Sequence, residues 1–202
     1  MPRKKAKNAY HHGDLRRALV SVASDMLSER GVSDFSLREA CRRAGVTIGA
    51  AIHHFGSSRG LLTAVATSAF ERLCSVFEAA QDHPGPPIDQ LIQALEGYAG
   101  LSKSIPGPFS IMFRWDLLDT EDPAFAEVGP RSYALLSEQV RRAAAPGNSE
   151  RDIGFASDAL WAAIHGLVDL GLLDKDGEGS EKIGFSVRAV IDGMLRGATD
   201  QA

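Results

Sequence analysis

The chain has 202 residues, of which 44% are hydrophobic and 24% charged, and its formal net charge is −4. These are ordinary values for a globular protein, and the length accommodates one large or two small domains. No uncharged apolar stretch of about eighteen residues occurs, so we expect no transmembrane span and no membrane partner. The basic N-terminus lacks an apolar segment of about 7–15 residues before Tyr10, so we expect no signal peptide.

The charges are unevenly distributed along the chain. A net charge of −4 taken alone argues against nucleic-acid binding. However, residues 1–75 carry a net charge of +6, and residues 76–202 carry −10. A basic first third joined to an acidic remainder favours a DNA-binding domain fused to a domain that stays off the DNA.

Residues 1–12 form a basic segment with little apolar content, which predicts a flexible arm. Its basic residues are Arg3, Lys4, Lys5 and Lys7. One interpretation is an arm that tracks DNA phosphates or enters the minor groove, with Lys4 and Lys5 as contacts. The other is a solvated tail.

Three short helices are predicted after the arm. The first spans about 14–29, has one apolar stripe and ends at Gly31. The second begins at Ser36, where the spacing of Ser36 and Glu39 predicts a capping box, and ends at Gly45. Thr47 is the predicted N-cap of the third helix. A tight glycine-containing turn between two helices is typical of a DNA-reading helix-turn-helix.

The third helix is the predicted recognition helix. Its inward residues are Ala51 and Phe55, and its outward residues are Ile48, Gly49, Ala50 and His53. Gly49 and Ala50 would let the backbone approach base edges, Ile48 and Ala50 could contact thymine methyls, and Thr47 or His53 could hydrogen-bond bases or phosphates.

These residues carry a resemblance to a known family. The motif comprises Gly45-Val46, Gly49-Ala50, His53-His54-Phe55, Gly56-Ser57 and Leu61-Leu62. On this motif, residues 13–77 resemble the DNA-binding domain of the TetR family of transcriptional repressors. The stretch from Tyr10 to Arg16, and Trp161 with His165 and Gly166, resemble the subgroup whose C-terminal domain is named for a W-H-G signature.

The resemblance implies further contacts with phosphate. It assigns Ser36, Arg38 and His54 to phosphate binding or orientation. The chain departs from the family pattern at Ile52, where the family usually has Tyr, and at Ser58, where it often has Lys. Both usual residues hold phosphate, so Arg59 and the basic arm are the candidates to compensate for their loss, and Ser58 stays among the expected DNA contacts.

The rest of the chain predicts an all-α protein of about nine helices. A helix-turn-helix domain at 13–56 is followed by a connecting helix at 57–80, which a Pro-Gly-Pro-Pro sequence ends. Every later segment has a helical pattern, with a possible interruption at Gly129-Pro130. Residues 81–202 are therefore predicted to form a helical ligand-binding and dimerisation domain.

Two groups of residues in that domain are candidates for binding. Aromatic and sulfur-containing side chains could line a small-molecule pocket, and the alternative for each is ordinary core: Tyr98, Phe109, Met112, Phe113, Trp115 and Phe155. The helix from Ala159 to Leu173 is apolar nearly all round, which predicts that a second chain covers it. The expected interface residues are Trp161, Leu167, Val168, Val187, Val190 and Ile191.

The sequence favours a homodimeric bacterial repressor in the cytoplasm, associated with the nucleoid, that binds a palindromic operator on double-stranded DNA and is released by a small molecule. The alternative is an all-α ligand- or protein-binding module with a degenerate helix-turn-helix. An enzyme is not expected, because no nucleophile elbow, phosphate loop or dinucleotide fingerprint occurs. The histidine pairs lack metal-site spacing, so no metal or cofactor is expected. Cys41 and Cys74 are predicted to be buried thiols, with redox sensing as the alternative.

Overall fold

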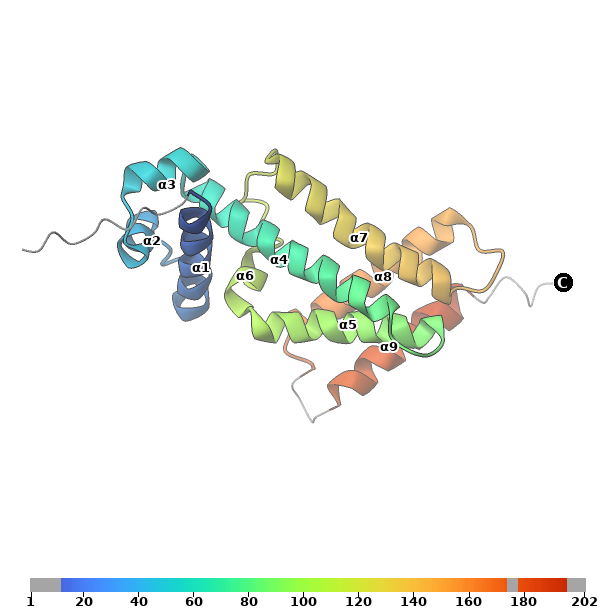
Figure 1. Ribbon diagram of the computed structural model, residues 1–202. Coiled ribbons are helices and arrows are strands. Elements are labelled where there is room, and N and C mark those ends of the chain that lie inside the picture. Colours follow the sequence, from blue (N-terminus) through green and yellow to red (C-terminus); the bar gives the residue numbers. More distant parts are fainter. Residues whose placement is uncertain (1–11, 174–177, 196–202) are drawn as a thin grey trace, which may run out of the picture.

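The computed structural model describes residues 12–173 and 178–195 (Figure 1). Within these residues the chain forms nine helices and no strand, so the predicted all-α class is confirmed. The helices are α1 (His12–Arg30), α2 (Leu37–Ala44), α3 (Ile48–Phe55), α4 (Ser58–Gln81), α5 (Pro87–Ser104), α6 (Pro106–Ile111), α7 (Pro123–Ala143), α8 (Glu150–Asp169) and α9 (Gly179–Met194). The predicted basic arm, including Lys4 and Lys5, lies outside the described residues except for His12, which begins α1.

The first three helices gather at one end of the molecule (Figure 1). They share a small core that includes Leu19, Ala40 and Ala51, all fully buried. Gly45 ends α2 in the left-handed region, with φ of 69°, which glycine adopts without strain. Thr47 caps α3 by accepting a hydrogen bond from the backbone N–H of Ala50, as predicted. Local sequence signals therefore determine the turn between α2 and α3.

The predicted capping box at the start of α2 is wrong. Ser36 occupies the N-cap position, but its side chain makes no capping hydrogen bond. The carboxylate of Glu39 instead accepts hydrogen bonds from Arg42 and Arg43 one turn later. Hydrogen bonds between a guanidinium and a carboxylate are stronger than those to a neutral amide, which explains why Glu39 turns away from the helix start.

Helix α4 is the spine of the molecule and leads from the N-terminal domain into the helical bundle (Figure 1). It packs most extensively against α7 and α5. Among the described helices it alone is long and apolar enough to cross a membrane, yet 67% of that window is buried inside the protein. The apolar character of α4 is therefore accounted for by its position in the core.

Helix α7 runs without a break through Pro130, where the sequence allowed an interruption. Proline removes one helical N–H and crowds the carbonyl four residues earlier, here that of Ala126. Both residues are exposed, so water can reach the carbonyl. After α7, Ser149 and Asp152 form the predicted capping box of α8, which ends at Asp169 rather than near 173.

Candidate nucleic-acid interface and aromatic cleft

The outer face of α3 carries the residues predicted to read DNA. Ile48, Gly49, Ile52 and His53 are exposed, whereas Ala51 on the opposite face is fully buried. Ala50 and His54 are half-buried, and Thr47 is exposed at the helix start. The predicted base-reading residues are thus brought together on one accessible surface at the tip of the N-terminal domain.

The residues assigned to phosphate lie beside this surface. Ser36 and Arg38 are exposed at the start of α2, and Ser58 is half-buried at the start of α4. Ser57 caps α4 by accepting the N–H of Gly60. The sequence did not single out Gly60, yet a Cβ there would lie 1.9 Å from the carbonyl oxygen of Phe55. Glycine therefore lets α4 begin directly against the end of α3.

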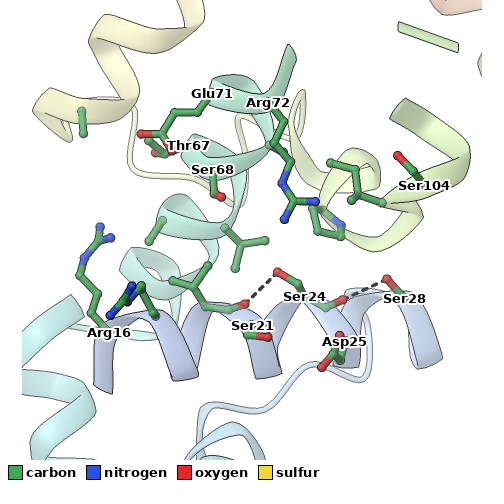
Figure 2. Close-up of a pocket in the computed structure, with 18 residues that line it drawn as sticks. Arg16, Ser21, Ser24, Asp25, Ser28, Thr67, Ser68, Glu71, Arg72 and Ser104 are labelled. Atoms are coloured by element: carbon green, nitrogen blue, oxygen red, sulfur yellow. Dashed lines mark hydrogen bonds between the residues drawn. The ribbon is translucent and has the colours of Figure 1, made fainter. Parts of the chain in front are cut away.

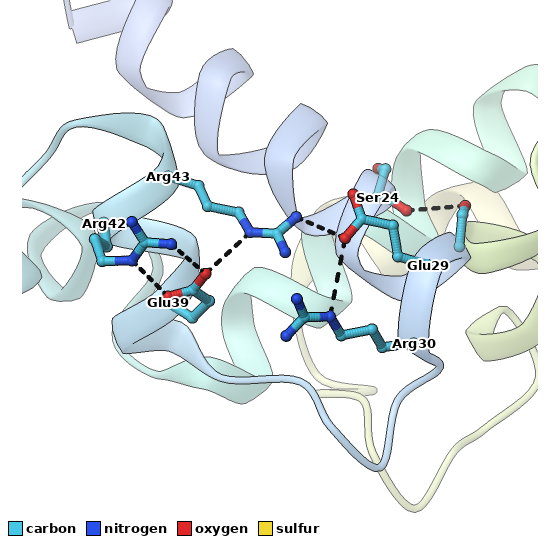
Figure 3. Close-up of polar contacts among 7 residues, drawn as sticks. Ser24, Glu29, Arg30, Glu39, Arg42 and Arg43 are labelled. Carbon is cyan, nitrogen blue, oxygen red and sulfur yellow. Dashed lines mark hydrogen bonds and ion pairs between the residues drawn. The ribbon is translucent and has the colours of Figure 1, made fainter.

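An ion-pair network on the other side of α2 neutralises two of its arginines (Figure 3). Arg42 binds Glu39 through two hydrogen bonds of 2.7 Å, and Arg43 bridges Glu39 and Glu29 of α1 at 3.1 and 2.8 Å. The hydrogen bonds that Glu39 accepts, chiefly those from Arg42, lower the pKa of Glu39 to about 2. The network ties α2 to α1 and leaves Arg38 as the arginine of α2 outside it.

Arg59 lies differently from its predicted role. Its guanidinium nitrogen Nη2 donates a hydrogen bond of 2.5 Å to the carbonyl oxygen of Leu118, in the segment between α6 and α7. One turn further along α4, Thr63 Oγ1 accepts the backbone N–H of Asp119 at 2.8 Å. The start of α4, next to the recognition helix, is thereby fastened to the C-terminal domain, and Arg59 faces that domain in this structure.

A second contact joins the two domains at the far end of α1. The backbone N–H of Gly107, in α6, donates to Ser28 Oγ at 3.2 Å. A Cβ at Gly107 would lie 2.3 Å from the backbone nitrogen of Ser28, so only glycine fits there. Neither contact with the N-terminal domain, at Arg59 or at Ser28, was predicted from the sequence, because each joins residues more than fifty positions apart.

Between these two contacts lies a groove of about 700 Å³ along α1 and α4 (Figure 2). Hydroxyl and charged side chains line much of it, among them Arg16, Ser21, Ser24 and Arg72. Such a polar surface is readily hydrated. The groove therefore exposes the polar side of α1 to solvent, whereas Leu19, Ala23 and Met26 on the other side of the helix are buried in the core.

An aromatic cleft of about 520 Å³ lies between α4, α7, α8 and the segment after α6. It is lined by Phe70, Phe113, Trp115, Thr120, Phe125, Ala126, Gly129, Pro130, Ser132, Tyr133 and Trp161. No side chain in this lining carries a charge, so the cleft suits an apolar or aromatic molecule. Thr120, Ser132 and Tyr133 supply hydroxyl groups that could orient it.

The predicted pocket residues divide into three groups. Phe113 and Trp115 line the cleft. Tyr98, Phe109 and Met112 are buried core residues, and Phe109 packs its ring edge-on against Phe113 beneath the cleft. Phe155 was assigned wrongly, because it is 50% exposed on α8 with its ring 5.1 Å from the guanidinium of Arg151.

Other cleft residues were missed or given another role. Phe70, Phe125 and Tyr133 were not among the predicted pocket residues, and Trp161 was predicted to lie at a dimer interface. Trp161 instead lies edge-on to Phe113, with ring centroids 6.0 Å apart. Only tertiary packing brings α4, α7 and α8 together, so no local signal marked this set.

Tyr98 and His165 form a polar pair inside the aromatic core. The hydroxyl of Tyr98 lies 2.6 Å from His165 Nδ1. Burial raises the pKa of Tyr98, and the charge of Asp169 adds to the effect, so the hydroxyl keeps its proton. Trp161 and His165 share a helix face, as predicted, and the contact with His165 gives the buried Tyr98 hydroxyl its hydrogen-bond partner.

The outer surface of α8 and α9 is apolar and uncovered within the chain. Phe185 is 76% exposed and Leu170 70%, and the predicted interface residues Leu167, Val168 and Val190 are half-buried. Val187 and Ile191 were expected at an interface, but both are fully buried in the core of their own chain. The helical period identified the apolar residues of α9 without showing which stripe faces inward.

Both cysteines are buried and free, and burial raises the pKa of each thiol. A raised pKa keeps a thiol protonated and unreactive, which favours the prediction of buried structural thiols over redox sensing. Among the described residues, no three His, Cys, Asp or Glu side chains form a group that could hold a metal ion.

Comparison with known proteins decides the nature of the N-terminal domain. Residues 19–65 match the family model described as "Bacterial regulatory proteins, tetR family". The match spans α2, α3 and the first part of α4, together with most of α1. The chain carries a TetR-family DNA-binding domain. The resemblance drawn from the recognition-helix motif is thus confirmed, and the fold is that of a TetR-like DNA-binding transcriptional regulator.

Solved structures extend the likeness over nearly the whole chain. A protein of unknown function from Rhodococcus sp. RHA1 is 26% identical, with a TM-score of 0.75 over 94% of this chain and 100% of that one. The TetR family regulator PfmR from Thermus thermophilus is 22% identical, with a TM-score of 0.62 over 89% and 98%. A TetR-family regulator from Streptomyces coelicolor is 22% identical, with a TM-score of 0.66 over 90% and 99%. No curated protein sequence matches the chain significantly.

Proposed function

We propose that the protein is a homodimeric repressor that leaves a palindromic operator when an apolar small molecule enters the aromatic cleft. The observation that carries this proposal is the segment between α6 and α7. Trp115 and Thr120 of this segment line the cleft, and between them Leu118 and Asp119 bind Arg59 and Thr63 of α4. A molecule that displaces this segment would act directly on the helix that follows the recognition helix.

The energetics of such a switch are modest. A ligand releases DNA only if it binds the DNA-incompetent arrangement more tightly than the competent one. Coupling between two sites is typically about 1–3 kcal/mol, which changes affinity roughly 5- to 150-fold. Helices that are packed against one another move as units, so a displacement of the segment between α6 and α7 would be transmitted to α4.

The dimer is the second part of the proposal. The exposed apolar residues of α8 and α9 would be covered by the same residues of a second copy, forming a four-helix interface. Two recognition helices related by a two-fold axis would read half-sites one helical turn apart or a multiple of it, about 34–36 Å per turn. A bacterial repressor of this kind acts in the cytoplasm, where the nucleoid lies.

The test is operator binding with and without aromatic compounds. DNA selected from random sequence supplies the operator, and a compound panel is screened for quenching of tryptophan fluorescence and for release of DNA. We expect Trp115→Ala to bind operator normally and to respond less to the releasing compound. Arg142→Ala is the control, because Arg142 is exposed on α7 and lies outside both the cleft and the surface of α8 and α9, and it should respond like the wild type. Equal responses in all three proteins would exclude the cleft as the inducer site.

A further inference from the structure

The recognition helix lacks the side chains that usually read bases. From Ile48 to Phe55 the sequence is IGAAIHHF, with no Asn, Gln, Arg or Lys. Those are the residues that form paired hydrogen bonds with adenine or guanine in the major groove. At the helix start, the hydroxyl oxygen of Thr47 already accepts the N–H of Ala50. The polar side chains left to contact a base edge are therefore His53 and Thr47, whose hydroxyl can still donate its own proton.

Two isoleucines are exposed on the outer face of α3. Ile48 and Ile52 are 43% and 44% exposed, four residues apart on one face of α3. Covering an exposed isoleucine with a partner stabilises the complex, roughly in proportion to the apolar area that is removed from water. In the major groove the apolar feature of a base pair is the 5-methyl group of thymine.

Gly49 adds an independent observation. Its backbone has no unusual φ, and a Cβ placed on it would meet no atom of the chain within 4 Å. Neither packing nor backbone conformation therefore requires glycine between Ile48 and Ala50. Because Gly49 has no side chain, the first turn of α3 protrudes less from the surface. Ile48 and Ile52 can therefore come closer to DNA that lies against the helix.

We propose that this chain selects its operator by thymine methyl groups, with Ile48 and Ile52 as the specificity-determining residues. Residues four apart on a helix are about 5–6 Å apart, and successive bases on one strand rise by about 3.4 Å. The two methyls therefore belong to thymines one or two base pairs apart in each half-site. The inference rests on the proposed operator binding and names the chemistry by which the half-site is recognised.

The experiment removes single methyl groups from the DNA. In an operator selected from random sequence, each thymine of a half-site is replaced in turn by deoxyuridine, which lacks only the 5-methyl. We expect two positions per half-site at which the Kd rises about 4-fold, the value for one methyl-sized group returned to water. Deoxyuridine outside the half-sites serves as the DNA control and should leave the Kd unchanged.

Matched protein variants assign each methyl to its residue. Ile48→Ala should lose its sensitivity to deoxyuridine at one position and keep it at the other, and Ile52→Ala should show the reverse. Both side chains are exposed, so neither change disturbs the core. An operator whose Kd is unaffected by deoxyuridine at every position would overturn the inference while leaving operator binding intact. If selection enriches no sequence, operator binding and methyl recognition fail together.

Discussion

Arg59 Nη2 and the carbonyl oxygen of Leu118, 2.5 Å apart, join the helix after the recognition helix to the segment that forms one wall of the aromatic cleft. Arg59 is also a residue that the sequence assigned to phosphate. In this structure its guanidinium is held by the C-terminal domain, and its charge contributes to the lowered pKa of Asp116, whose first cause is the hydrogen bond from Arg114. The hydrogen bond to Leu118 is therefore an interaction that a phosphate contact by Arg59 would have to replace.

The coupling segment can be tested without touching Arg59. Thr63 and Thr67 are both buried in α4, and each donates its hydroxyl to the carbonyl four residues earlier. Only Thr63 also accepts the N–H of Asp119. Thr63→Val should cost about 1 kcal/mol of stability through that lost bond, speed hydrogen exchange at Asp119, and reduce the response to a releasing compound. Thr67→Val is the control and should leave exchange at Asp119 unchanged. Equal exchange in the two variants would remove Thr63 from the coupling route.

The dimer proposal predicts a monomer from a single surface change. Phe185 is 76% exposed in the chain, so Phe185→Asp should fold normally, yet it would place a charge in the apolar interface. We expect sedimentation equilibrium to give a dimer for the wild type at micromolar concentration and a monomer for the variant, with operator affinity reduced at least about 10-fold in the variant. Ala134→Asp, at an exposed position of α7, is the control and should remain dimeric. A monomeric wild type would contradict the proposal.

Stability should depend on pH through Glu39. Its pKa is lowered from the ordinary 4.5 to about 2, because Arg42 and Arg43 hydrogen-bond the charged form. Folding therefore gains stability from Glu39 above pH 4.5, and this contribution is lost as the pH falls from about 4.5 toward 2. Thermal unfolding of Glu39→Gln should show a shallower decline of Tm over that interval than the wild type. Parallel Tm curves would show that the network does not stabilise the fold.

The sequence predicted those features that depend on neighbouring residues. Gly45, the Thr47 cap, the Ser149–Asp152 capping box and the helix break before Pro87 are local, and all are present in the structure. The prediction of a capping box at Ser36 was wrong because Arg42 and Arg43 hydrogen-bond Glu39 instead. The Ser-x-x-Glu pattern spans only four residues and contains neither arginine.

The predictions that failed concern which apolar residues face which neighbour. Periodicity placed Val187 and Ile191 on the apolar stripe of the last helix, and residue type made Phe155 a pocket candidate. Neither signal showed that the first two face the chain's own core, or that Phe155 points away from the cleft. The cleft combines Phe70 of α4, Phe125 of α7 and Trp161 of α8, which meet only through long-range packing. Residue type identified the aromatic character of the domain, and the tertiary arrangement determined the site.

The most direct measurement is DNA binding by a chain altered only at the recognition surface. At Gly49 a side chain would meet no atom of the protein, so Gly49→Glu should fold normally while placing a negative charge against DNA. Loss of one good base contact costs about 1–3 kcal/mol, so we expect operator affinity in a gel-shift titration to fall about 5- to 150-fold. Gly100→Glu in α5, where a side chain likewise meets nothing, is the matched control and should bind as the wild type does. Equal binding by wild type, Gly49→Glu and Gly100→Glu would contradict the claim that this chain reads DNA through α3.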